Sequence, residues 1–76
     1  MSDTPVMRGN EFIKRIRVYA NRHGIPFEWR PDLGKGSHGV LTLGHRRTVV
    51  RNPKDELKTG TLHGMLKQLG LSSDDI

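Results

Sequence analysis

The 76-residue sequence contains no cysteine, which excludes a disulfide framework and a cysteine-ligated zinc site. Its longest uninterrupted apolar run has three residues, 18–20, whereas a membrane-spanning helix needs about 20. The first dozen residues also lack the apolar stretch of a secretory signal. We therefore expect a cytoplasmic protein without a membrane segment. A chain of this length forms one small domain with a thin core.

Acidic residues are absent between Asp32 and Asp55, although the whole chain has 8 of them. The basic residues of this interval carry a formal charge of +5, which equals the net charge of the whole chain. They are Lys35, Arg46, Arg47, Arg51 and Lys54. Such a local excess is typical of a surface that binds a polyanion such as RNA. A basic surface that only faces solvent has the same composition, so charge alone leaves both interpretations open.

Apolar periodicity predicts two helices. The first covers about 10–23, with Asn10 as its N-cap and Gly24 just past its end. Its apolar face consists of Phe12, Ile13, Ile16, Tyr19 and Ala20. The second helix begins near Thr59 or Thr61 and ends at Gly70. Its apolar stripe consists of Leu62, Met65, Leu66 and Leu69.

Three short strands are predicted between the helices. Phe27 and Trp29 alternate with polar residues over 27–30, and two β-branched runs, 40–43 and 48–51, flank a predicted turn at 44–47. The order is helix, three antiparallel strands, helix. We expect an α+β fold with both helices on one face of the sheet. Residues 1–8 are predicted to form a flexible lead, and residues 9–76 a single domain.

A glycine-dense loop, 34–39, joins the first two predicted strands. It matches G-x-G-x-x-G formally, but a strand rather than a helix follows it, so a dinucleotide site is excluded. Its glycines and main-chain amides suit an anion, and Lys35 and Ser37 add a charge and a hydroxyl donor. His38, where the loop meets the strand, can transfer protons near neutral pH. A tight hairpin loop with an incidental histidine explains the same residues equally well.

The other histidines and the aromatic residues are weaker candidates. His23 suits the C-terminal end of the first helix, and His63 falls on the solvent side of the second. His45 lies in a turn beside two arginines, where a phosphate contact and a plain turn position are both open. The aromatic residues of the first strand could stack on bases, but so small a core needs them. No pair of histidines has metal-binding helical spacing, so we expect neither a metal nor another cofactor.

Two short motifs, in this order and at this spacing, resemble the HicA toxin family, the small mRNA-cleaving toxins of HicAB toxin–antitoxin systems. The first motif is Lys35-Gly36-Ser37-His38. The second is Lys58-Thr59-Gly60-Thr61-Leu62, which runs into Met65-Leu66-Lys67-Gln68-Leu69-Gly70. The resemblance covers roughly residues 8–71 and includes the opening helix and Trp29.

The resemblance implies an α-β-β-β-α fold similar to that of double-stranded RNA-binding domains. It also implies endoribonuclease activity without a metal, with His38 as the catalytic residue, and a HicB-type antitoxin that covers and blocks the active site. The chain departs from the family at Arg51-Asn52-Pro53, where members often carry a histidine, and at Gly39-Val40-Leu41 after the G-S-H motif. The auxiliary catalytic groups therefore stay open.

RNA carries its own nucleophile, the 2′-OH beside each phosphate. A metal-free nuclease therefore needs proton transfer and donors that stabilise the charge on the phosphoryl oxygens. We assign proton transfer to His38, as general acid or base. The residues predicted to bind RNA are Lys35, Gly36, Ser37, Arg46, Arg47 and Arg51. The alternatives are a non-catalytic RNA-binding module of the same fold and a basic adaptor that binds only protein.

Overall fold

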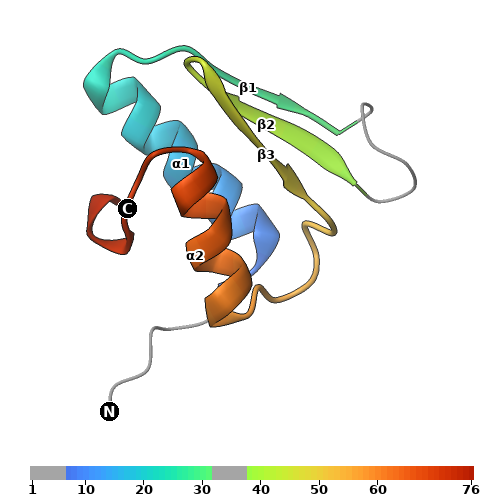
Figure 1. Ribbon diagram of the computed structural model, residues 1–76. Coiled ribbons are helices and arrows are strands. Elements are labelled where there is room, and N and C mark those ends of the chain that lie inside the picture. Colours follow the sequence, from blue (N-terminus) through green and yellow to red (C-terminus); the bar gives the residue numbers. More distant parts are fainter. Residues whose placement is uncertain (1–6, 32–37) are drawn as a thin grey trace.

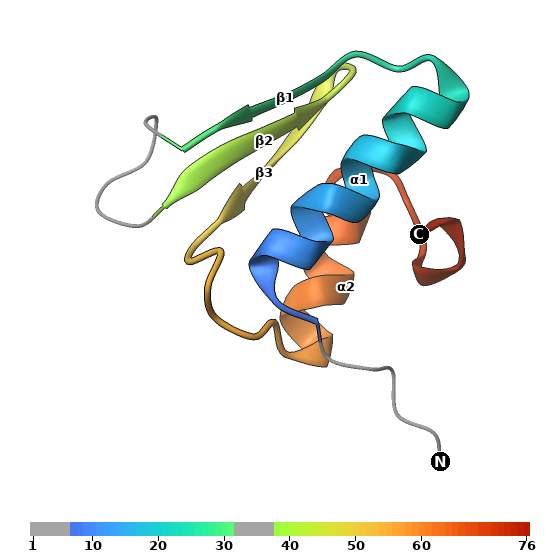
Figure 2. The ribbon, with the colours of Figure 1, turned by 180° about the vertical axis from the view of Figure 1, so that it is seen from behind.

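The computed structural model describes residues 7–31 and 38–76 of the chain. Its elements are helix α1 (Gly9–His23), strands β1 (Phe27–Arg30), β2 (Gly39–Leu43) and β3 (Arg46–Val50), helix α2 (Thr59–Gln68) and the 3₁₀ turn η1 (Ser73–Asp75). The predicted α+β fold and its α-β-β-β-α order are confirmed. Both helices lie on one face of the sheet, as the two opposite views show (Figures 1 and 2). No helix in the described part is long and apolar enough to span a bilayer.

The sheet is antiparallel and has β2 in its centre. Burial alternates along β2, because Leu41 and Leu43 are buried against the helices whereas Val40 and Thr42 are only half-buried. Leu41 of β2 pairs with Trp29 of β1 on one side and with the buried Thr48 of β3 on the other. The helix-covered face of the sheet therefore includes the indole, and the opposite face is open to solvent.

One core joins the helices and the sheet, and each fully buried large side chain in it contributes about 1.5–3 kcal/mol relative to exposure. Phe27 and Trp29 pack against this core while staying partly exposed, as expected for the aromatic residues of the first strand. The largest fully buried side chains are Phe12, Ile16, Leu41, Leu62, Leu66 and Val50.

Helix α1 begins at Gly9, one residue earlier than predicted, and the predicted cap Asn10 lies inside it. Arg8 occupies the N-cap position without a side-chain cap. Main-chain carbonyls replace the cap, because the Gly9 N–H donates to the Asp55 carbonyl at 3.0 Å and the Asn10 N–H to the Pro53 carbonyl at 2.8 Å. At the other end, Gly24 closes the helix with φ 65°, as the sequence predicts.

The β2–β3 hairpin has a two-residue turn, Gly44–His45, in place of the predicted four-residue turn at 44–47. Gly44 has φ 61°, and every residue with a positive φ in the described part is a glycine. A positive φ at only the first central residue is the pattern of a type II′ turn, which favours glycine there. The shorter turn makes Arg46 and Arg47 strand residues and ends β3 one residue before Arg51.

Candidate active site

His38 directly precedes β2 and is half-buried. The next residue, Gly39, is buried beneath the indole of Trp29. A Cβ atom on Gly39 would lie 2.4 Å from Cη2 and 2.8 Å from Cζ2 of Trp29, and 2.9 Å from the Pro31 Cα atom. Only glycine leaves room for the indole here. The contact between the indole and Gly39 therefore fixes the backbone from which the His38 side chain projects.

An open cavity of about 650 Å³ lies beside β3, and His38 is part of its wall. We call it the His38 cavity. Its other walls come from β3, from the connection between β3 and α2, and from α2 itself. Figure 1 shows this connection running from the end of β3 to the start of α2. The lining residues besides His38 are Val49, Arg51, Asn52, Asp55, Glu56, Leu57, Lys58, Thr61 and Met65.

The His38 cavity contains charges of both signs. Arg51 and Lys58 supply two cations, and both side chains are exposed. Cationic side chains are the usual partners of phosphate, through charge-assisted hydrogen bonds. Asp55 and Glu56 supply carboxylates, which can accept or return a proton. The cavity therefore combines one imidazole, two cations and two carboxylates.

Sequence reasoning missed Asp55, Glu56, Lys58 and Thr61 as site residues. Lys58 and Thr61 belong to the second family motif, which served only to mark the family. Their place in the sequence, just before the predicted apolar stripe of the second helix, could have indicated that they lie at the start of α2. The two carboxylates gave no indication, since they lie just outside the acid-free interval.

The start of α1 holds the cavity wall formed by residues 52–57. Besides the two carbonyls that cap α1, the Leu57 N–H donates to the Met7 carbonyl at 2.8 Å. The Arg8 guanidinium donates to the Lys54 carbonyl at 2.7 Å. Arg8 also forms a single antiparallel β-bridge with Glu56. These contacts fix the wall although it has no regular secondary structure of its own.

Of the predicted RNA-binding residues, the three that the structure describes, Arg46, Arg47 and Arg51, do not gather at one point. Lys35, Gly36 and Ser37 lie outside the described residues, and Arg51 lines the His38 cavity.

Arg46 and Arg47 lie at the other end of β3, beside the hairpin turn. Arg47 pairs with Thr42, which is about 14 Å along the strand from His38 at about 3.4 Å per residue. The two neighbouring arginines also face opposite sides of the sheet. A Cβ on Gly70 would lie 2.9 Å from the Arg46 Nε atom, on the helix side, whereas Arg47 shares the open face with Thr42.

The sequence model of the family described as HicA toxin of bacterial toxin-antitoxin matches residues 27–71, more than half of the chain. The chain belongs to the HicA toxin family. Membership in HicA places it among the toxins of bacterial toxin–antitoxin systems and implies an antitoxin partner. The HicA match spans the sheet, the connection and α2, so it contains every described residue of the His38 cavity. No curated protein and no solved structure in the comparisons matches the chain.

Proposed function

We propose that this HicA toxin is an endoribonuclease that cleaves mRNA without a metal and uses His38 for proton transfer. The observation that carries the proposal is that His38 lines the same cavity as Arg51 and Lys58. RNA brings its own nucleophile, so the protein has to move protons and stabilise charge. A histidine beside two phosphate-binding cations supplies both functions. An mRNA substrate also places the toxin in the cytoplasm.

In the proposed reaction, the 2′ oxygen attacks the adjacent phosphorus and the bond from phosphorus to the 5′ oxygen breaks. A base takes the proton of the 2′-OH, and an acid gives a proton to the departing 5′ oxygen. The products are a 2′,3′-cyclic phosphate and a 5′-OH end. His38 performs one of the two transfers, and Asp55 or Glu56 stands in the same cavity for the other. Each such transfer contributes about 10²–10⁴-fold to the rate.

The positions of the cations suggest where the RNA strand would run. The reacting phosphate lies between Arg51 and Lys58. Lys35, Gly36 and Ser37, which directly precede His38 in the sequence, are proposed to bind RNA as well. The strand continues over the open face of the sheet to Arg47. Arg46 reaches RNA only from the other face, at the far end of β3. A HicB-type antitoxin that covers the His38 cavity would block this path.

Cleavage of a fluorophore-labelled RNA by the purified full chain, with and without EDTA, tests the assignment. We expect His38→Ala to reduce the rate by about 10²–10⁴-fold and EDTA to leave it unchanged. His23→Ala is the matched control, because His23 is exposed at the C-terminal end of α1 and does not line the His38 cavity. If both His38→Ala and His38→Gln cleave the RNA as fast as wild type, His38 takes no part in the reaction.

A non-catalytic RNA-binding module is the second candidate. It is favoured by one observation: His38 is the sole histidine among the described residues of the cavity. This alternative predicts that wild-type protein binds the labelled RNA and leaves it intact. The same assay separates the two functions, since an electrophoretic shift without shorter products supports the module and shorter products support the nuclease.

A further inference from the structure

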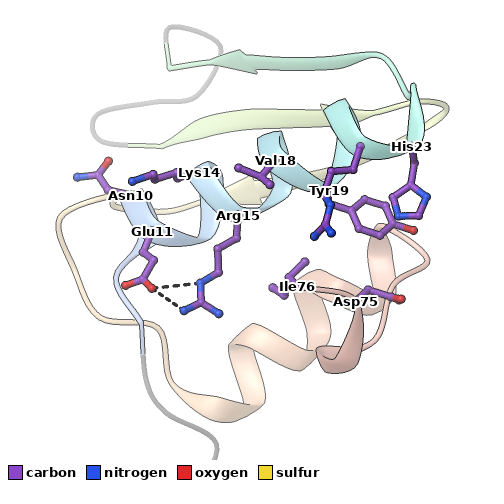
Figure 3. Close-up of a pocket in the computed structure, with 10 residues that line it drawn as sticks. Asn10, Glu11, Lys14, Arg15, Val18, Tyr19, His23, Asp75 and Ile76 are labelled. Carbon is purple, nitrogen blue, oxygen red and sulfur yellow. Dashed lines mark hydrogen bonds and ion pairs between the residues drawn. The ribbon is translucent and has the colours of Figure 1, made fainter.

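A second concave surface lies between α1 and the C-terminal turn η1 (Figure 3). We call it the α1 groove. It has a volume of about 670 Å³. Among the described residues, none lines both this groove and the His38 cavity. Every described lining residue of the α1 groove also lies outside residues 27–71, so the groove is not part of the family match.

A regular stripe runs along the α1 side of this groove. Lys14, Val18 and Arg22 follow one another at intervals of four residues, or about 6 Å along the helix axis. Val18 is 48% exposed, which is unusual for a large apolar side chain in the described part. The half-buried Tyr19 of α1 and Ile76, which follows η1, also line the groove (Figure 3). The stripe therefore presents an apolar side chain with a cation one helical turn away on each side.

The carboxylates at the groove already have partners. Glu11 accepts two hydrogen bonds from the Arg15 guanidinium, at 2.7 Å and 3.1 Å (Figure 3). Asp75 accepts a hydrogen bond from the Ser72 N–H at 2.9 Å. No ion pair within the described residues involves Lys14 or Arg22. Once Glu11 and Arg15 are paired, the groove holds the cations Lys14 and Arg22 against one carboxylate, Asp75, so it keeps a positive excess.

We propose that the α1 groove docks an acidic amphipathic helix of a partner protein. An apolar side chain of that helix would cover Val18, and carboxylates four residues before and after it would pair with Lys14 and Arg22. This is helix-in-groove recognition, in which anchors recur at helical spacing. RNA fits less well, because its phosphate backbone offers no apolar side chain to cover the exposed Val18. A partner held here leaves the His38 cavity open, so docking and nuclease activity are independent.

Two synthetic peptides of about 15 residues, long enough for marginal helicity, test the proposal. One carries Glu, Leu and Glu at intervals of four residues, and the other carries Lys, Leu and Lys at the same positions. Fluorescence anisotropy measures the binding of each labelled peptide to the full chain. We expect the acidic peptide to bind and the basic peptide not to bind, and we expect Val18→Asp to abolish binding.

Charge reversal identifies the stripe. Lys14→Glu and Arg22→Glu should each weaken binding of the acidic peptide by about tenfold, and the double variant should instead bind the basic peptide. Lys67→Glu is the matched control, since Lys67 is an exposed helical lysine outside the groove. Circular dichroism and RNA cleavage by each variant confirm folding and intact nuclease function. If the wild-type chain does not cleave RNA, the proposed nuclease activity is refuted, but the docking proposal is unaffected.

Amide chemical shifts of the full chain locate each ligand. The acidic peptide should perturb residues 10–23 and 75–76 and leave the neighbours of His38 unchanged. The proposal is overturned if the acidic peptide fails to bind or perturbs the His38 cavity instead. It is also overturned if Lys14→Glu and Lys67→Glu weaken binding equally, or if a short single-stranded RNA perturbs the α1 groove and displaces the peptide.

Discussion

At the scale of single residues, the position of His38 depends on the absence of a side chain at the neighbouring Gly39. Gly39 presents only hydrogen where any other residue has a Cβ, and the indole of Trp29 occupies that space. Cores tolerate such close contact because their atoms interdigitate at the density of organic crystals. A catalytic group is useful only when its orientation is fixed, so a packed indole next to His38 serves the proposed reaction as well as stability.

Gly39→Ala should therefore lower the rate of the proposed RNA cleavage more than the addition of one methyl group would suggest. The new methyl group would overlap the indole, and the resulting overpacking costs about 1–3 kcal/mol and moves the backbone beside His38. Combining it with Trp29→Leu should recover part of the lost cleavage rate, because the smaller side chain makes room. Thermal unfolding and RNA cleavage, measured on the single and double variants, check this.

Gly64→Ala is the control for that substitution. Its Cβ would meet no atom within 4 Å, and alanine in a helix interior stabilises by about 0.5–1 kcal/mol. We expect a higher melting temperature and normal cleavage. If Trp29→Leu leaves Gly39→Ala as inactive as before, the overlap with the indole is not the cause of the defect.

His38 could be singled out from the sequence, whereas the role of Trp29 could not. A histidine between a glycine-rich loop and a strand indicates a possible proton-transfer site without any tertiary information. The contact between Trp29 and Gly39 exists only because β1 and β2 pair in a particular register, with Arg30 opposite Val40. Hydrophobic periodicity places the indole in the core but does not say which backbone atom lies beneath it.

At the scale of secondary-structure elements, the ends of helices and strands are where prediction and structure differ. The predicted N-cap at Asn10 was wrong because main-chain carbonyls of Pro53 and Asp55, more than 40 residues away in sequence, satisfy the first N–H groups. The predicted four-residue hairpin turn was wrong because Arg46 and Arg47 are paired strand residues. They join β3 because β2 provides the pairing partners Leu43 and Thr42.

One hydrogen bond links β3 to α2, the two elements that flank the His38 cavity. The buried Thr48 hydroxyl donates to the side-chain oxygen of Gln68. Thr48→Val keeps the shape of the side chain but leaves that oxygen to water, so we expect a loss of about 0.5–1.5 kcal/mol of stability. Urea unfolding of the variant measures it.

Thr42→Val is the matched control, since Thr42 faces the open side of the sheet on the central strand. Valine suits a strand, so this variant should unfold within about 0.5 kcal/mol of wild type. Equal losses in the two variants would mean that the methyl-for-hydroxyl exchange itself, rather than the bond to Gln68, sets the cost.

At the scale of the whole molecule, the charge of +5 is spread over more than one surface. The sequence predicts a basic interval, but a strand turns successive side chains to opposite faces of its sheet. Arg46 consequently lies against Gly70 on the helix side, and Arg47 lies on the open face. A further pair of cations, on α1, belongs to a separate groove. Net charge therefore predicted a polyanion partner without predicting which cations that partner would contact.

This separation predicts unequal effects of two neighbouring substitutions on RNA binding. For single-stranded RNA, each neutralised phosphate contributes a slope of about −0.7 to the dependence of log K on log salt concentration. Arg47→Gln should weaken binding and flatten that slope by about 0.7, because Arg47 lies on the proposed path of the strand. Arg46→Gln should leave the slope nearly unchanged, because Arg46 lies against Gly70 on the helix side of the sheet. Titrations of the His38→Ala chain at several salt concentrations measure both without cleavage. Equal flattening by the two variants would show that RNA contacts both faces of the sheet at the hairpin end, and the proposed path would have to wrap around the edge of β3.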